Sequence, residues 1–83
     1  MISFEESAFA DYLRWAVDDR KIFDKINALI NEIVRDPFRG TGKPEPLKWD
    51  WPGYWSRRIT QEHRLVYKVL HDHIIVASCK DHY

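Results

Sequence analysis

Residues 54–79, YWSRRITQEHRLVYKVLHDHIIVASC, are the most informative part of the sequence for the fold, because they hold three consecutive strand-like segments. Each segment is rich in aromatic and β-branched side chains and tends to alternate apolar with polar positions, as half-buried strands do. The segments are residues 54–59, 64–70 and 74–79. Short polar connections separate them, so we expect neighbouring strands to pair as antiparallel hairpins. A further strand is expected just upstream, at residues 47–49.

The N-terminal half has a different pattern, which predicts two helices. Residues 1–5 favour a short opening strand, and apolar side chains then recur at helical spacing over residues 9–16. Asp19 is a good N-cap for a second helix, which is expected to end before Pro37. Residues 39–46 hold two of the three glycines and two of the four prolines, so they predict a loop.

These elements predict an α+β fold in which a short N-terminal strand and two helices pack on one face of a twisted antiparallel sheet. A chain of 83 residues has room for one core, so residues 1–83 are expected to form a single domain. The other face of the sheet is then open to solvent or ligand. If Ile59 and Leu65 face the helices, Arg58 and Arg64 point to the open face. The two arginines meet across one hairpin only if its loop is odd in length, as residues 60–62 would be.

The charge balance limits the classes of function. Lys and Arg number 13 and Asp and Glu also number 13, so the net charge is zero, which argues against a protein that coats nucleic acid through a broad basic surface. The sequence has no apolar run long enough for a signal peptide or a membrane span. The single cysteine, Cys79, excludes an intramolecular disulfide. We therefore expect a cytoplasmic protein without membrane contact, and a chain this small would gain stability from a homodimer or a tight partner.

Glu45 is the first candidate for chemistry. It lies between Pro44 and Pro46, whose fixed backbone angles restrict its carboxylate, and this suits a general base. The alternative is a solvated glutamate that pairs with Lys43 or Lys48.

Arg58 and Arg64 are candidates for binding phosphate, because guanidinium groups bind it in a bidentate way and stabilise the charge of a phosphoryl transition state. Arg57 must face the opposite side from Arg58. Salt bridges or solubility are the alternative roles of surface arginines.

His82 is a candidate proton donor near neutral pH, and Tyr83 after it could stack on a base. A frayed tail is the alternative. His71 and His73 flank Asp72 in a predicted turn but lack a convincing third ligand, so we expect no metal site and no other cofactor. Cys79 has no obvious activating base and is expected to be a buried strand residue.

Four ordered segments resemble the YoeB (Txe) toxins of the RelE and ParE superfamily, over nearly the whole chain. The segments are residues 40–48 (GTGKPEPLK), 53–60 (GYWSRRIT) and 62–67 (EHRLVY), and the pair His82 and Tyr83. Lys80 stands where arginine is usual, and Trp51 with Pro52 replaces a smaller pair.

The resemblance implies a toxin of a type II toxin-antitoxin system with a RelE-like fold. Such toxins cleave mRNA in the ribosomal A site, often form homodimers, and are neutralised by an antitoxin of the YefM kind. By resemblance, Glu45 is the general base, Arg64 stabilises the phosphate and His82 is the general acid. The positions that match supporting or RNA-binding residues are Lys48, Arg58, Glu62 and Tyr83.

Together these residues imply an endoribonuclease that uses the 2′-hydroxyl of RNA as nucleophile and needs no metal. Two other classes of function stay open. One is a poison of DNA gyrase with a ParE-like fold, and the other is a protein-interaction module of the same fold without catalysis.

Overall fold

A computed structural model of the chain describes residues 1–48 and 51–81. Within these ranges the helices and strands follow one another along the chain as β1 (Ile2–Phe4), α1 (Glu6–Asp18), α2 (Arg20–Arg35), β2 (Glu45–Pro46), β3 (Tyr54–Arg58), β4 (Arg64–Leu70) and β5 (His73–Ser78). The α+β class and the helix pair that follows an N-terminal strand are therefore as predicted.

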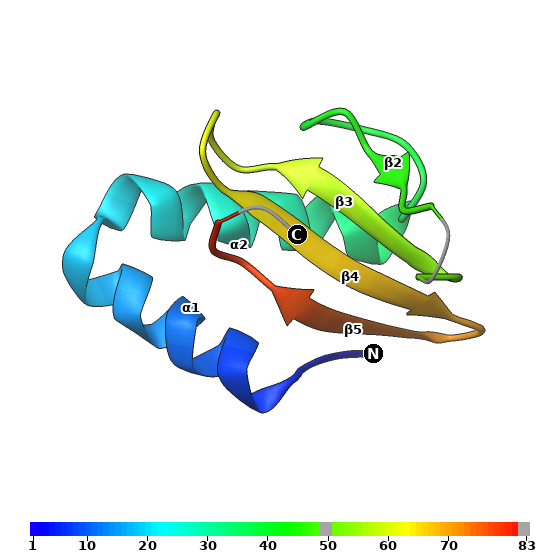
Figure 1. The fold of residues 1–83 in the computed structure, drawn as a ribbon, viewed down its shortest axis with the longest axis horizontal. Coiled ribbons are helices and arrows are strands. Elements are labelled where there is room, and N and C mark those ends of the chain that lie inside the picture. Colours follow the sequence, from blue (N-terminus) through cyan, green and yellow to red (C-terminus); the bar gives the residue numbers. More distant parts are fainter. Residues whose placement is uncertain (49–50, 82–83) are drawn as a thin grey trace.

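The strands form one sheet in the order β1-β5-β4-β3-β2. The pairs β2–β3, β3–β4 and β4–β5 are antiparallel, as the hairpin pattern predicts. The N-terminal strand was predicted to pack with the helices on a face of an antiparallel sheet, but β1 is instead an edge strand of the sheet and pairs with β5 in parallel, which makes the sheet mixed. β1 leads into α1, and the helix pair brings the chain back across the sheet before β2 begins (Figure 1). A strand of three residues carries no sequence signal for its partner, so this pairing was not predictable.

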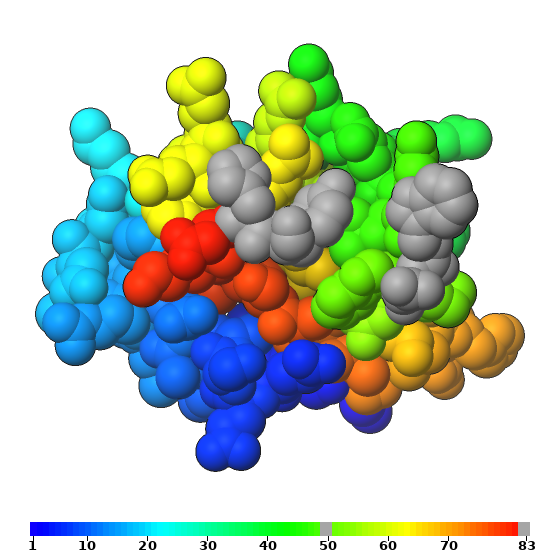
Figure 2. All heavy atoms as spheres, viewed as in Figure 1, coloured from blue at the N-terminus to red at the C-terminus, as the bar shows by residue number. Residues whose placement is uncertain are grey.

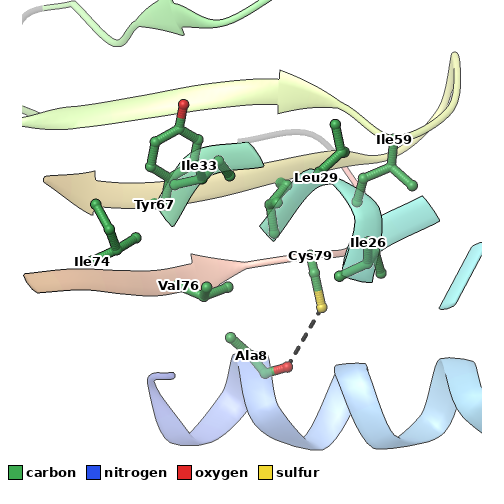
Figure 3. Close-up of a cluster of buried hydrophobic side chains, with 10 residues drawn as sticks. Ala8, Ile26, Leu29, Ile33, Ile59, Tyr67, Ile74, Val76 and Cys79 are labelled. Atoms are coloured by element: carbon green, nitrogen blue, oxygen red, sulfur yellow. Dashed lines mark hydrogen bonds between the residues drawn. The ribbon is translucent and has the colours of Figure 1, made fainter. Parts of the chain in front are cut away.

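α2 crosses behind the strands in Figure 1, which looks onto the other face of the sheet, and α1 packs beside α2 and against β5. Ile26, Leu29 and Ile33 of α2 and Ala8 of α1 are buried against Tyr67 and its neighbours on the strands. Figure 3 shows these side chains pointing into the space between the helices and the sheet. The apolar stripe of the second predicted helix therefore forms the helical side of the core.

Asp19 caps α2 as predicted. Its carboxylate accepts hydrogen bonds from the main-chain N–H groups of Lys21 and Ile22, at 3.1 and 3.3 Å. These two donors at a helix N-terminus have no partner within the helix, so the cap satisfies them.

The upstream strand is displaced from its predicted position. It comprises Glu45–Pro46, where a loop was expected, and Glu45 pairs with Ser56. Pro46 is tolerated because β2 is an edge strand, where an N–H group is not needed on the outer side. Leu47 continues the pairing by donating its N–H to the carbonyl of Tyr54 at 2.9 Å.

No helix in the described ranges is long and apolar enough to cross a membrane.

Candidate active site

The register of the sheet brings the predicted site residues of three strands to one face. Glu45 of β2 lies opposite Ser56, and Ser56 lies opposite Val66 of β4, so these three residues form one row across the sheet. The next row is the pair Arg58 and Arg64, which lie directly opposite each other. Residues two positions apart on a strand share a face, and such rows are roughly 7 Å apart. Glu45, Arg58 and Arg64 therefore share the face that the helices leave open.

The hairpin between β3 and β4 confirms the predicted facing of the arginines. Its tip is residues 60–62, an odd number, and the main-chain N–H groups of Ile59 and Thr60 both bond to the carbonyl of His63. The Thr60 hydroxyl accepts from the N–H groups of Glu62 and His63 and closes the turn. Ile59 is buried on the helix side, whereas Arg58 is exposed on the open side.

Arg57 faces away from Arg58, as predicted, but no role was predicted for it; its side chain is fully buried on the helix face. Each of its five N–H donors has an acceptor, so the guanidinium is completely satisfied. The acceptors are the Tyr67 hydroxyl, the Glu32 carboxylate, and the main-chain carbonyls of Asp36, Arg39 and Thr41. Three of the five belong to the segment after α2, which leads to Glu45. Arg57 therefore fastens that segment to β3.

Glu32 supports the same segment from α2. Its carboxylate accepts the main-chain N–H of Thr41 at 2.8 Å and the Arg57 guanidinium at 3.2 Å. Both contacts lower the pKa of Glu32, and the hydrogen bond from Thr41 has the larger effect. Gly40 lies beside the Glu32 and Arg57 side chains with a positive φ of 130°, and a Cβ there would displace the Glu32 carboxylate and the Arg57 guanidinium.

The segment that leads into β2 lies directly against β3. The N–H of Arg58 donates to the carbonyl of Gly42 at 2.7 Å. Gly42 has φ +86°, and a Cβ there would lie 2.9 Å from the Arg58 carbonyl oxygen. Lys43 also adopts a positive φ, of 52°. Tight contact of Gly42 with β3 thus fixes the backbone three residues before Glu45, while the Glu45 side chain stays exposed.

Lys48 and Glu62 are both exposed and lie beyond opposite ends of β3. Lys48 follows Leu47, which is paired with the first residue of β3, whereas Glu62 is at the hairpin tip beyond its last residue. The structure therefore does not bring these two predicted supporting residues together.

His82 and Tyr83 lie outside the described residues. The residue before them, Asp81, is held beside the arginine pair, because the N–H of Arg64 donates to the Asp81 carbonyl at 3.0 Å. The N–H of Asp81 in turn donates to Nδ1 of His63 at 2.8 Å. Asp81, the last residue that the structure describes, thus lies at the edge of the Arg58 and Arg64 row.

Ser56 is a second residue that the sequence did not single out. It lies in the row with Glu45, is fully buried, and its hydroxyl has no hydrogen-bond partner within the described part of the chain. Its residue type carries no signal of burial.

Two weaker candidates have structural roles: Cys79 is buried, as predicted, whereas His73, which was predicted to lie in a turn, is the first residue of β5. Cys79 is fully buried and donates to the carbonyl of Ala8 at 3.5 Å, as the dashed line in Figure 3 marks. Burial raises the pKa of this thiol to about 12, which makes it a poor nucleophile. His73 contacts the Ser3 hydroxyl at 2.7 Å. Among residues 1–48 and 51–81 no cluster of three or more His, Cys, Asp or Glu side chains could hold a metal ion.

Known proteins resemble this chain over nearly its whole length. A family described as YoeB-like toxin of bacterial type II toxin-antitoxin system matches residues 4–83. Toxin YoeB of Streptomyces coelicolor is 52% identical over 82 residues, which cover 99% of this chain and 98% of that protein. Toxin YoeB of Escherichia coli strain K12 is 52% identical over 80 residues, 96% and 95% of the two chains.

Solved structures of similar proteins show the same architecture. The YoeB/ParE toxin from Agrobacterium tumefaciens superposes with a TM-score of 0.95 at 48% identity, covering 99% of this chain and 98% of that one. The YoeB dimer from Staphylococcus aureus gives 0.92 at 51% identity, with 99% and 95% covered. The toxin of the YoeB-YefM complex from the same species gives 0.91 at 49% identity, with 100% and 97% covered.

Proposed function

This chain belongs to the YoeB-like toxin family of bacterial type II toxin-antitoxin systems, and we propose that it is an endoribonuclease that cleaves mRNA in the ribosomal A site and so inhibits translation. The sheet register supports the proposal most directly. It sets one carboxylate, Glu45, on the same face as a cross-strand pair of arginines, Arg58 and Arg64. A base and a phosphate-binding pair on one open face are what RNA transesterification requires.

Each residue has a role in the proposed reaction. Glu45 removes the proton from a ribose 2′-hydroxyl, whose oxygen attacks the adjacent phosphorus. Arg64, with Arg58 beside it, stabilises the charge that develops on the phosphoryl oxygens. His82 gives a proton to the departing 5′-oxygen, so the products are a 2′,3′-cyclic phosphate and a free 5′-hydroxyl. The scheme uses no metal ion.

The remaining residues bind or position RNA in this proposal. Lys48, which lies beyond β2, and Arg58 are exposed cations and can contact backbone phosphates. Tyr83 stacks on a base, and Glu62 supports the hairpin tip next to His63. The net charge of zero gives little affinity for free RNA through counterion release, so the ribosome supplies much of the positioning.

The proposed partners follow from the relatives. Their structures include a YoeB-YefM complex and a YoeB dimer, so we propose that this chain binds a YefM-like antitoxin and forms a homodimer. The bacterial ribosome with its mRNA is the target.

The proposal is tested by primer extension on a message translated in a purified bacterial system. Wild-type protein should give discrete cuts inside codons, and Glu45→Gln should lower the single-turnover rate by roughly 10² to 10⁴, the usual contribution of a general base. Lys43→Gln, which removes a neighbouring exposed charge, is the matched control and should cut almost as fast as wild type.

Two further measurements test the proposed attack by the 2′-hydroxyl. A message with a single 2′-deoxynucleotide at the cut position should resist cleavage there, and the cut ends should carry 2′,3′-cyclic phosphates. An uncut message combined with gyrase-dependent DNA breaks would instead favour the gyrase poison. An uncut message without DNA breaks, but with antitoxin binding, would favour the interaction module.

A further inference from the structure

We infer that Trp15 and His63 form a clamp that fixes the direction in which the chain leaves Asp81, and that both are positioning residues for His82. This inference rests on the proposed function, because it concerns the proton donor of the same site. Trp15 belongs to α1 and His63 to the hairpin between β3 and β4, so the clamp holds the C-terminal segment from two sides. In Figure 2 the red atoms near the C-terminus lie between the yellow atoms of this hairpin and the blue atoms of α1.

Trp15 provides the first half of the clamp. Its indole Nε1 donates to the carbonyl of Cys79 at 3.0 Å, a contact between residues 64 positions apart. Its ring also meets the His63 imidazole edge to face, with the ring centres 4.9 Å apart and an interplanar angle of 71°. The two aromatic rings therefore support each other as well as the segment.

His63 provides the second half, and it is 92% buried. Its Nδ1 accepts the main-chain N–H of Asp81 at 2.8 Å, which requires Nδ1 to be unprotonated. The proton of the neutral ring is then on Nε2, which faces the Glu62 carboxylate at 3.7 Å. A buried histidine with one defined acceptor role is well suited to orient a backbone segment.

The clamp fixes both sides of one residue. The N–H of Asp81 bonds to His63, and its carbonyl accepts the N–H of Arg64 at 3.0 Å. Asp81 has φ +61°, a left-handed conformation that is unfavourable for a residue with a side chain. The two hydrogen bonds offset this cost and hold the turn. His82 is the next residue in the sequence after Asp81, whose carbonyl is hydrogen-bonded to Arg64.

The chemical consequence is preorganisation. A general acid must lie within hydrogen-bond reach of its leaving group, and a displacement of about 1 Å can lower the rate roughly 100-fold. Loss of the bond at Nδ1 should therefore lower kcat while leaving the KM for mRNA-programmed ribosomes nearly unchanged, because neither clamp residue is proposed to touch RNA.

Three substitutions at His63 distinguish the loss of its hydrogen-bond acceptor from a change in side-chain size. In His63→Asn the amide oxygen can occupy the place of Nδ1, in His63→Gln the amide reaches the place of Nε2 instead, and His63→Leu has no acceptor. We expect kcat to fall about 10- to 100-fold in the Gln and Leu variants and to stay within about threefold of wild type in the Asn variant. Trp15→Phe keeps a ring but loses the donor to Cys79, so it should lower kcat by a smaller factor.

Hydrogen exchange of the Asp81 amide tests the clamp without reference to catalysis. The amide should be protected in wild type and in His63→Asn, and should exchange roughly 10-fold faster in His63→Gln, as expected for one lost hydrogen bond. Comparing the two amide variants remains decisive even if His63→Leu does not fold.

The outcomes separate this inference from the proposed function. Equal exchange and equal kcat in the Asn and Gln variants would overturn the clamp, as would a loss that appears in KM alone. A wild-type protein that does not cut a translated message would overturn the proposed function and leave the exchange result to decide whether the clamp exists.

Discussion

Arg57 and Arg58 are neighbours in sequence with opposite environments. Arg57 is buried with all five donors satisfied, and Arg58 is exposed on the open face. Arg57→Lys should lower the free energy of unfolding by about 3 kcal/mol, because an ammonium has three donors and leaves buried carbonyls without partners. Arg58→Lys is the matched control and should change it by less than about 0.5 kcal/mol. Urea unfolding measures both, and equal effects would show that the Arg57 network is not stabilising.

Cys79 predicts a loss of stability in alkaline solution. Burial raises the pKa of its thiol from 9.0 to about 12, so the folded protein keeps a proton that the unfolded chain releases. The stabilising effect is complete below pH 9 and is lost as the pH rises from about 9 towards 12. Burial also raises the pKa of Tyr67, which acts in the same direction. Unfolding free energies measured between pH 8 and 11 should fall with a steeper slope in wild type than in Cys79→Ala.

At the scale of residues, the sequence predicts which face of the sheet a side chain occupies better than it predicts which groups that side chain contacts. Alternation along the strands predicts that Arg58 and Arg64 share the open face, and the register confirms it. The same alternation puts Arg57 on the helix face but gives no reason for its burial. Its partners there include main-chain carbonyls of an irregular segment, and no side-chain pattern encodes where such carbonyls point.

Gly42 and Gly53 allow a matched test of how β2 is held against β3. Both have a positive φ near 85°, so a substitution by Ala costs each a similar strain of about 1 kcal/mol. A Cβ at Gly42 would also lie 2.9 Å from the Arg58 carbonyl, whereas one at Gly53 meets nothing nearer than 3.9 Å. Gly42→Ala should therefore displace the segment that carries Glu45 and lower the rate of RNA cleavage, and Gly53→Ala should not.

Thermal unfolding and cleavage assays on the two variants check this prediction. Equal Tm values together with equal cleavage rates would mean that the contact at Gly42 relaxes without moving β2.

At the scale of elements, strong local sequence patterns were sufficient to predict a helix or a strand, and weak patterns were not. The apolar stripe and the Asp19 cap identify α2, and the hairpin pattern identifies β3, β4 and β5. β2 was displaced by two residues because Pro44 and Pro46 suggest a loop, although an edge strand accepts proline. The parallel partner of β1 depends on how the helix pair returns the chain, which no short segment specifies.

At the scale of the molecule, size makes self-association the natural source of extra stability. A chain of 10.0 kDa has a small core, and a relative forms a dimer. For a dimer coupled to folding, Tm should rise with protein concentration, by a few degrees over a 100-fold range. Light scattering should give about 20 kDa, twice the chain mass. A mass of one chain and a Tm independent of concentration would contradict the dimer.

The strand order also affects how the protein emerges during its own synthesis. β1 is made first and pairs with β5, the last strand in the sequence. β1 therefore cannot join the sheet until Ser78 has left the ribosome that makes it. The hydrogen bonds of Asp81 to His63 and Arg64 form later still. The candidate active site is therefore not assembled while the chain is being translated. Under the proposed function, each copy stays inactive until the ribosome that makes it has nearly finished the chain.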